Sequence, residues 1–171
     1  MRPTCTVPAI LAMLCVWWIA TGQLSAQSIA LSTQQLTLQS DVVAVGTVSA
    51  TQCEWNADKT RITTRVTIAV REFLKGGAGE QRITVLTPGG EIGDVGELYC
   101  GAARFQKDEE VVVFAKKQQG PVMQVAGGGM GKFTIERDKA TQVLMTAPGM
   151  TLDNLRTQVR SAAQAPVPEE K

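Results

Sequence analysis

The chain has 171 residues and a formal net charge of +1, with 17 basic residues, 16 acidic residues and no histidine. The lack of histidine excludes serine–histidine–aspartate catalysis and histidine-ligated metal sites. A charge this close to neutral gives little attraction for a polyanion, so we expect no nucleic-acid partner.

The first 26 residues have the pattern of an export signal. Arg2 supplies a positive start, an apolar run extends from Val7 to Ala20, and small residues precede a predicted cleavage after Ala26. We therefore expect a signal peptide at 1–26 and a periplasmic or extracellular location. The apolar run is shorter than the roughly 20 residues that cross a bilayer, so we expect no stable membrane span after cleavage. An uncleaved anchor, lengthened through Trp17 and Trp18, is the alternative.

About 145 residues follow the leader, which is enough for one compact domain. The leader carries one basic residue and no acidic residue, so its removal takes the formal charge from +1 to zero. We divide the chain into a signal peptide (1–26), an N-terminal segment (27–40), a barrel domain (41–147), a C-terminal helix (148–164) and a disordered tail (165–171).

Two of the four cysteines, Cys53 and Cys100, lie after the leader. An even pair in an exported chain predicts one disulfide bond, which would stabilise the fold by roughly 3–4 kcal/mol on the chain-entropy model. The alternative is a redox or metal-binding pair. It lacks the CxxC spacing typical of such sites.

The pattern after the leader is mainly that of short strands. The clearest strand runs from Ile62 to Arg71, where apolar and polar residues alternate with a period of two. Gly46 lies inside the first strand and predicts a bulge or sharp bend. We expect strands at Asp41 to Ala50, Ile62 to Arg71, Arg82 to Thr87, Leu98 to Cys100, Val111 to Ala115, Val122 to Val125 and Lys132 to Glu136.

The segments outside these strands have their own patterns. Ser28 to Gln39 predicts a short helix or an extended segment, and Gln52 to Thr60 predicts a polar connection. Near the C-terminus, Thr151 is a candidate N-cap for a helix whose apolar residues recur at helical spacing, namely Leu152, Leu155 and Val159. Together these elements predict a mainly β fold, a small barrel with a C-terminal helix.

The strand from Asp41 to Val48 resembles the opening strand of the netrin-type module, whose fold is also used by tissue inhibitors of metalloproteinases. Further segments resemble the same family in the same order and cover most of Asp41 to Phe133: Val66 to Gly76, Thr84 to Pro88, Cys100-Gly101 and Phe105 to Phe114. The resemblance implies an OB-like (oligonucleotide/oligosaccharide-binding-type) barrel. The chain is also similar to a group of exported bacterial proteins of this plan that end in a strand like Gly131-Lys132-Phe133.

One family property does not carry over. The metalloproteinase inhibitors bind the target's zinc through the amine and carbonyl of an N-terminal cysteine. Here the expected first residue after cleavage is Gln27, with no cysteine near it, and the family's additional disulfides are absent. The resemblance therefore implies a fold but not protease inhibition.

The glycine-rich loop from Pro88 to Glu97 is the best candidate for an interaction surface, because its glycines allow close approach of a backbone. The residues we single out are Gly89, Gly90, Glu91, Asp94 and Glu97 of this loop, together with Trp55, a residue type enriched in binding sites. The three acids could ligate a hard cation, but their spacing matches no calcium loop, so we expect no metal and no cofactor.

Two other motifs have simpler explanations than chemistry. The run from Gly127 to Lys132 differs from a phosphate loop, because Ala126 and Phe133 stand where that motif needs glycine and a hydroxyl residue, and we expect a turn. The acids Asp108, Glu109 and Glu110 could pair as in a glycosidase, but we expect a polar turn.

We conclude from the sequence that the protein is not an enzyme. The leading hypothesis is an exported barrel module that binds a protein or an envelope component through its loops. The alternatives are a structural or accessory envelope protein without a specific ligand, and a hydrolase that uses carboxylates alone.

Overall fold

The computed structural model describes residues 31–77, 79–118, 120–139, 143–146 and 149–165. The expected signal peptide, its cleavage site and all of the expected tail (165–171) except Ala165 lie outside these residues. The described elements are α2 (Thr33–Gln39), β1 (Val42–Trp55), β2 (Ile62–Lys75), β3 (Arg82–Pro88), β4 (Gly90–Ile92), β5 (Val95–Glu97), β6 (Glu110–Lys117), β7 (Met123–Val125), the 3-10 helix η1 (Gly128–Gly131), β8 (Lys132–Arg137), β9 (Leu144–Thr146), β10 (Met150–Thr151) and α3 (Leu152–Gln164).

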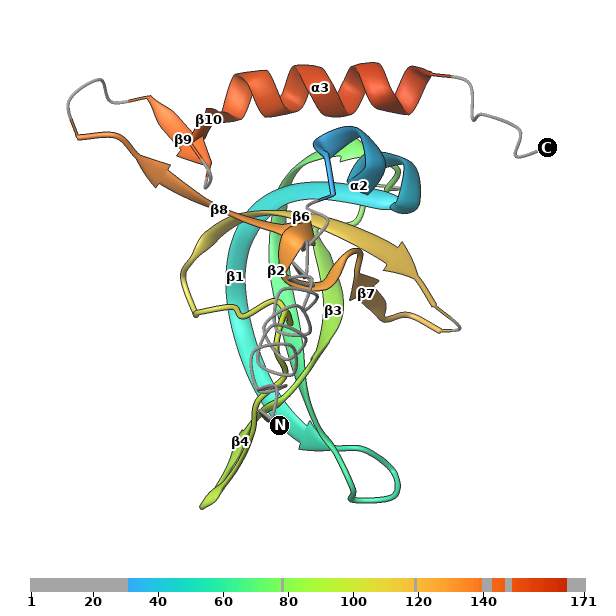
Figure 1. Ribbon diagram of the computed structural model, residues 1–171, viewed down its shortest axis with the longest axis vertical. Coiled ribbons are helices and arrows are strands. Elements are labelled where there is room, and N and C mark those ends of the chain that lie inside the picture. Colours follow the sequence, from blue (N-terminus) through green and yellow to red (C-terminus); the bar gives the residue numbers. More distant parts are fainter. Residues whose placement is uncertain (1–30, 78, 119, 140–142, 147–148, 166–171) are drawn as a thin grey trace, which may run out of the picture.

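Five strands close into a barrel in the order β1-β2-β3-β7-β6, and β6 pairs back onto β1. The β3–β7 pair is parallel, and the other pairs of the barrel are antiparallel. This arrangement confirms the expected mainly β fold, a small barrel with a C-terminal helix. Of the two forms expected for the N-terminal segment, the structure has the short helix. In Figure 1, α3 lies at one end of the molecule, whereas β4 and the turn between β1 and β2 lie at the opposite end.

Gly46 lies where β1 bends, as the sequence predicts. The register of β1 with β2 slips by one residue between Val45 and Gly46 and again between Val48 and Ala50. A Cβ atom on Gly46 would lie 2.3 Å from the carbonyl oxygen of Ala69. The bend therefore brings two backbones closer together than any side chain allows.

Both faces of the central strands are buried, and the barrel therefore has two apolar cores. The inner core fills the barrel with Val42, Ala44, Val48, Val66, Ile68, Ile83, Val85, Val111, Val113, Met123 and Val125. The outer core lies under the helices and contains Val43, Val45, Val112, Phe114 and Ile135 of the sheet with Leu36, Leu152, Leu155 and Val159. Alternate residues in the first half of β1 and in the middle of β6 thus enter opposite cores, which is why the segments 42–45 and 111–115 are apolar without interruption.

Polar side chains fix the ends of α2. Ser32 and Gln35 form a capping box, in which Ser32 Oγ accepts from the Gln35 N–H and Gln35 Oε1 accepts from the Ser32 N–H. At the other end, the Lys75 ammonium donates to the carbonyl oxygens of Thr37 and Ser40, both at 2.7 Å. The barrel strand β2 thereby holds the C-terminal end of the helix.

The helix α3 begins as expected, because Thr151 Oγ1 accepts from the N–H of Asn154. Ion pairs join the helix to the barrel, because the Glu72 carboxylate of β2 pairs with Arg156 at 2.8 Å and with Arg160 at 2.9 Å. Within the described residues, no helix is both long and apolar enough to cross a membrane.

Three strand assignments from the sequence were wrong. β1 does not end at Ala50, because β2 continues to pair with it as far as Trp55 opposite Ile62. Leu98 to Cys100 is not a strand, and the glycine-rich loop before it contains the β4–β5 hairpin instead. The sheet does not end at β8, because β9 pairs with β8 and β10 pairs with β9.

The replacement Gly46→Ala should lower the free energy of unfolding by about 2–3 kcal/mol, since its methyl group would collide with the Ala69 carbonyl. Urea denaturation measures the change. Gly96→Ala is the matched control, because a Cβ there meets only Glu91 Cγ at an ordinary 3.5 Å. Equal stability of the two variants would contradict the close approach.

Candidate functional site

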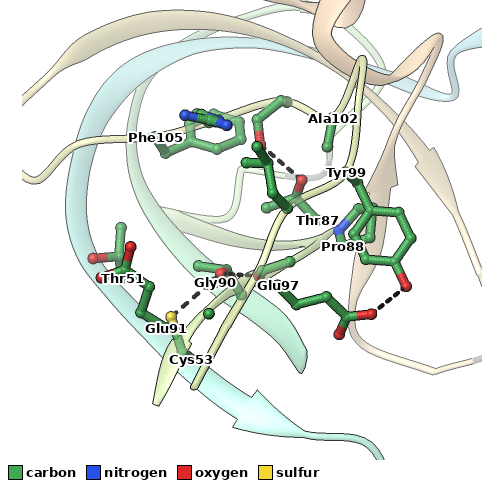
Figure 2. Close-up of a pocket in the computed structure, with 16 residues that line it drawn as sticks. Thr51, Cys53, Thr87, Pro88, Gly90, Glu91, Glu97, Tyr99, Ala102 and Phe105 are labelled. Atoms are coloured by element: carbon green, nitrogen blue, oxygen red, sulfur yellow. Dashed lines mark hydrogen bonds between the residues drawn. The ribbon is translucent and has the colours of Figure 1, made fainter. Parts of the chain in front are cut away.

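A cleft of about 530 Å³ opens at the end of the barrel where the β4–β5 hairpin lies. Its floor and near wall come from β1, β2 and β3, and the hairpin and the segment 98–105 supply the rest. Figure 2 shows Thr51 and Cys53 of β1 on one side of the cleft, Tyr99 on another and Phe105 at the far end. Its volume falls in the range of small-ligand sites, about 300–1,000 Å³.

The sheet register brings hydroxyl and thiol groups to the floor of the cleft. Cys53 is the register partner of Thr64, and Thr64 is the partner of Thr87 on β3. Val66, two residues along β2, belongs to the inner core, so these residues lie on the same inner face. The cleft therefore continues the barrel interior, where small polar side chains replace the valines and isoleucines.

Gly89 and Gly90 bring the hairpin backbone down onto this floor. The Thr64 hydroxyl donates to the Gly89 carbonyl at 2.6 Å. A Cβ atom on Gly90 would lie 2.6 Å from Cys53 Sγ and 2.7 Å from Thr64 Oγ1, and its φ of 143° also favours glycine. These glycines thus serve close approach within the barrel itself.

Glu97 joins the hairpin to the turn between β1 and β2. Its carboxylate accepts from the Ile62 N–H at 2.6 Å, from the Tyr99 hydroxyl at 2.8 Å and from the Arg61 guanidinium at 3.2 Å. The Ile62 hydrogen bond, followed by those from Tyr99 and Arg61, lowers the pKa of Glu97 below its ordinary value. The hydrogen bonds from Arg61 to Glu97 and to the Tyr99 hydroxyl raise the pKa of Arg61. Glu97 is thus held as a charged acceptor that positions one side of the cleft.

Glu109 holds the turn through which the chain passes from the cleft lining at Phe105 to β6. Its carboxylate is bonded to Lys132 and Thr134 of β8, and it accepts from the Gln106 N–H. Burial acts to raise the pKa of Glu109, but the bonds from Lys132, Thr134 and Gln106 together lower it. Lys132 also lies 5.4 Å from the ring centroid of Phe105, which lines the cleft.

The neighbouring acids do not face each other as a carboxylate pair. Glu109 binds β8, whereas Glu110 pairs with Arg71 of β2 at 3.2 Å. Asp108 has a left-handed φ of 66°, which places it in a turn. The sequence prediction of a polar turn before β6 is confirmed.

The expected disulfide between Cys53 and Cys100 is not formed, and this prediction is corrected: both cysteines are free thiols. Cys53 lies on β1 in contact with Thr64 Oγ1 at 3.4 Å, under the Gly90 backbone. Cys100 is exposed in a turn after β5 and borders a separate, smaller hollow. The segment around Tyr99 borders both hollows.

Four of the six interaction residues named from the sequence line the cleft: Gly89, Gly90, Glu91 and Glu97. The other two residues do not line the cleft. Asp94 lies in the turn between β4 and β5, and Trp55, whose surface is 38% exposed, lies at the end of β1. Across the described ranges, no three acidic or cysteine side chains gather as a metal site. The glycine run from Gly127 forms η1 and leads into β8, with positive φ at Gly127 and Gly128, as the turn prediction requires.

Sequence reasoning missed Arg61, Tyr99 and Arg104, which share the cleft or its border. Each is an isolated polar or aromatic residue in an irregular segment, so no periodic pattern singles it out. When the chain is compared with protein-family models and with curated proteins, none matches.

The replacement Glu109→Gln should lower the free energy of unfolding at pH 7 by about 2–3 kcal/mol, since it leaves the half-buried Lys132 ammonium without its charge partner. Because the pKa of Glu109 is depressed, its stabilisation is complete above pH 4.5 and is lost as the pH falls through the folded-state pKa. Urea denaturation of wild type and variant from pH 7 to pH 3 should therefore show a difference that shrinks in acid.

The adjacent Glu110→Gln is the control for that experiment. Its partner Arg71 is about half exposed, so its loss should cost less than about 0.5 kcal/mol. Equal effects of the two replacements, or a Glu109→Gln difference that grows in acid, would contradict the assigned roles.

Alkylation of the purified, folded protein without reductant should modify both cysteines, with Cys100 reacting faster than Cys53. Cys100 is exposed, whereas Cys53 is half-buried beneath the hairpin. Mass spectrometry of timed samples follows both sites. If neither cysteine reacts until reductant is added, the protein instead contains the Cys53–Cys100 disulfide bond.

Proposed function

We propose that this chain is an exported, non-catalytic barrel module that binds a protein or another envelope component through the loops at the mouth of its barrel. The observation that carries the proposal is the apolar surface beside the cleft. Leu98 is 74% exposed and Val95 is 50% exposed, and both lie at or directly after β5. Exposed apolar side chains grouped beside a cleft are typical of protein-binding sites.

Trp55, the last residue of β1, lies in the neighbouring hairpin at the same end of the molecule. It is the register partner of Ile62, and the N–H of Ile62 is bonded to Glu97 of β5. Of the five large hydrophobic residues exposed in the described part of the chain, three lie at this end: Trp55, Val95 and Leu98. The two hairpins therefore present apolar groups on a frame held by the Glu97 bonds, which limits the entropy lost on binding.

The chemistry of the carboxylates supports a non-catalytic role. A general acid needs a raised pKa, whereas the pKa values of Glu97 and Glu109 are lowered by the hydrogen bonds that hold them. The export proposal rests on the leader pattern at 1–26, and the proposal that no nucleic acid binds rests on a formal charge near zero. The closed five-strand barrel supports the proposed likeness to the netrin-type module.

The replacement Leu98→Ser should reduce capture of the partner from an envelope extract by about tenfold, because it removes an apolar anchor worth about 1–2 kcal/mol. Met130→Ser is the matched control, since Met130 is 40% exposed on η1, away from the cleft lining. Quantitative pull-down with the exported protein as bait measures the loss. Equal, unsaturable capture by all three proteins would favour the structural or accessory alternative.

A further inference from the structure

The second half of β1 has an edge that no strand of the described residues covers. β6 pairs with β1 only from Val42 to Thr47, where Thr47 lies opposite Glu110. Beyond that point β1 continues to Trp55 with β2 on one side alone. Uncovered strand edges present main-chain donors and acceptors to any extended chain of matching length.

A turn at Asp108 leaves this edge open. Val48 makes the last contacts, donating to the Glu109 carbonyl at 2.9 Å and accepting from the Asp108 N–H at 2.8 Å. The left-handed φ of Asp108 then turns the chain away from β1, and the Glu109 carboxylate holds the turn through the Gln106 N–H. The diverted chain places Phe105 on the far wall of the cleft. The space of the cleft therefore lies between Phe105 and the free edge of β1.

The hydrogen-bonding pattern shows which residues of β1 offer their main chain to this gap. The Ile62 carbonyl accepts from Gly89 and the Val70 N–H donates to Gln81, so even-numbered residues of β2 bond toward β3. Their partners on β1 are therefore non-hydrogen-bonded pairs whose N–H and C=O groups point to the free edge. These partners are Thr51, Cys53 and Trp55.

Two of these residues, Thr51 and Cys53, also line the cleft with their side chains. Thr51 and Cys53 border the space of about 530 Å³, opposite Phe105 and beside Gly90. An added strand would therefore bond to the edge and direct alternate side chains inward, as in other β-augmentation complexes. Because the wall at Phe105 faces the free edge of β1, the cleft has room for one extended segment and not for a second sheet.

The charged residues of the cleft lining indicate which side chain the bound segment carries. Three charged residues line the cleft: Glu97, which Arg61 neutralises, and the exposed Glu91 and Arg104, neither of which has an ion pair or a side-chain hydrogen bond among the described residues. Glu91 lies on the hairpin strand β4, whereas Arg104 lies in the segment 98–105. A carboxylate on the incoming segment would complement this guanidinium. The expected occupant is therefore an extended peptide segment that has free main-chain N–H groups and carries an acidic side chain.

We propose that the cleft binds an extended, acidic segment of a partner protein, which adds as a strand to the free edge of β1 at Thr51, Cys53 and Trp55 and places a carboxylate at Arg104. This inference rests on the proposed function and specifies its partner. A second copy of the chain, paired through the same edge, is the competing occupant and an outcome of the test.

The probe is a displayed library of random seven-residue peptides selected on the immobilised protein. The strongest binder is then synthesised in two forms, N-methylated on even or on odd residues. In one form, the methyl groups replace the N–H groups that would donate to β1, and this form should lose about tenfold or more in affinity. In the other form, the methylated N–H groups point away from β1, and this form should bind like the parent peptide. Selected sequences should be enriched in acidic residues, and Arg104→Gln should weaken binding.

Thr51→Pro tests the edge from the protein side. It removes an N–H that faces away from β2, so the barrel should retain its melting temperature while peptide affinity falls by about tenfold. Gln52→Ala is the control, because Gln52 lies outside the cleft lining and its main chain bonds toward β2. If the proline variant does not fold, the two N-methylated peptides still decide the question.

Several results would overturn the inference. They are equal binding of both N-methylated forms, unchanged affinity of a folded Thr51→Pro variant, failure of the library to yield a binder, or a dimer of the wild type that Thr51→Pro dissociates. Loss of partner capture by Leu98→Ser together with any of these would keep the proposed function and reject this mode of binding.

Discussion

The closure of the barrel and the opening of its cleft both depend on how β1 shares its edges. The first half of β1 lies between β2 and β6, and these pairings close the barrel. The second half keeps β2 but loses β6 where Asp108 turns the chain away. A single strand is thus paired on both edges at one end of the barrel and has one free edge at the other end.

The two halves differ in what their side chains bury. In the first half, Val42 to Val45 are fully buried because alternate residues enter the inner core and the core beneath the helices. Past the slip in register at Ala50, the residues are exposed or half-buried and mostly polar. The apolar half supplies hydrophobic stabilisation, and the polar half remains in water without large cost because its free main-chain groups are solvated.

Regular periodicity made much of the fold predictable. The alternation from Ile62 and the helical spacing after Thr151 each correspond to a described element, and Gly46 marked the irregularity in β1. The three-residue strands β4 and β5 were not predictable in the same way, because they are too short for any period and contain glycines. Strand length was likewise misjudged at Gln52, where pairing with β2 overrides a polar local sequence.

The candidate site was only half predictable for a related reason. Loop composition pointed to Glu91 and Glu97, but two partners of Glu97, Arg61 and Ile62, come from a distant segment that only the folded barrel brings close. Cysteine counting predicted a bond between two residues that the fold places in different hollows. Such pairings depend on tertiary geometry, which single-residue patterns do not encode.

The position of α3 has a practical and biological consequence. Its apolar face is held against the outer core and its Arg156 and Arg160 against Glu72, so the helix is fixed to the barrel as one unit. It lies at the end of the molecule opposite β4. A surface, a tag or a neighbouring domain attached through the end of α3 would therefore lie away from the barrel mouth and leave the cleft accessible.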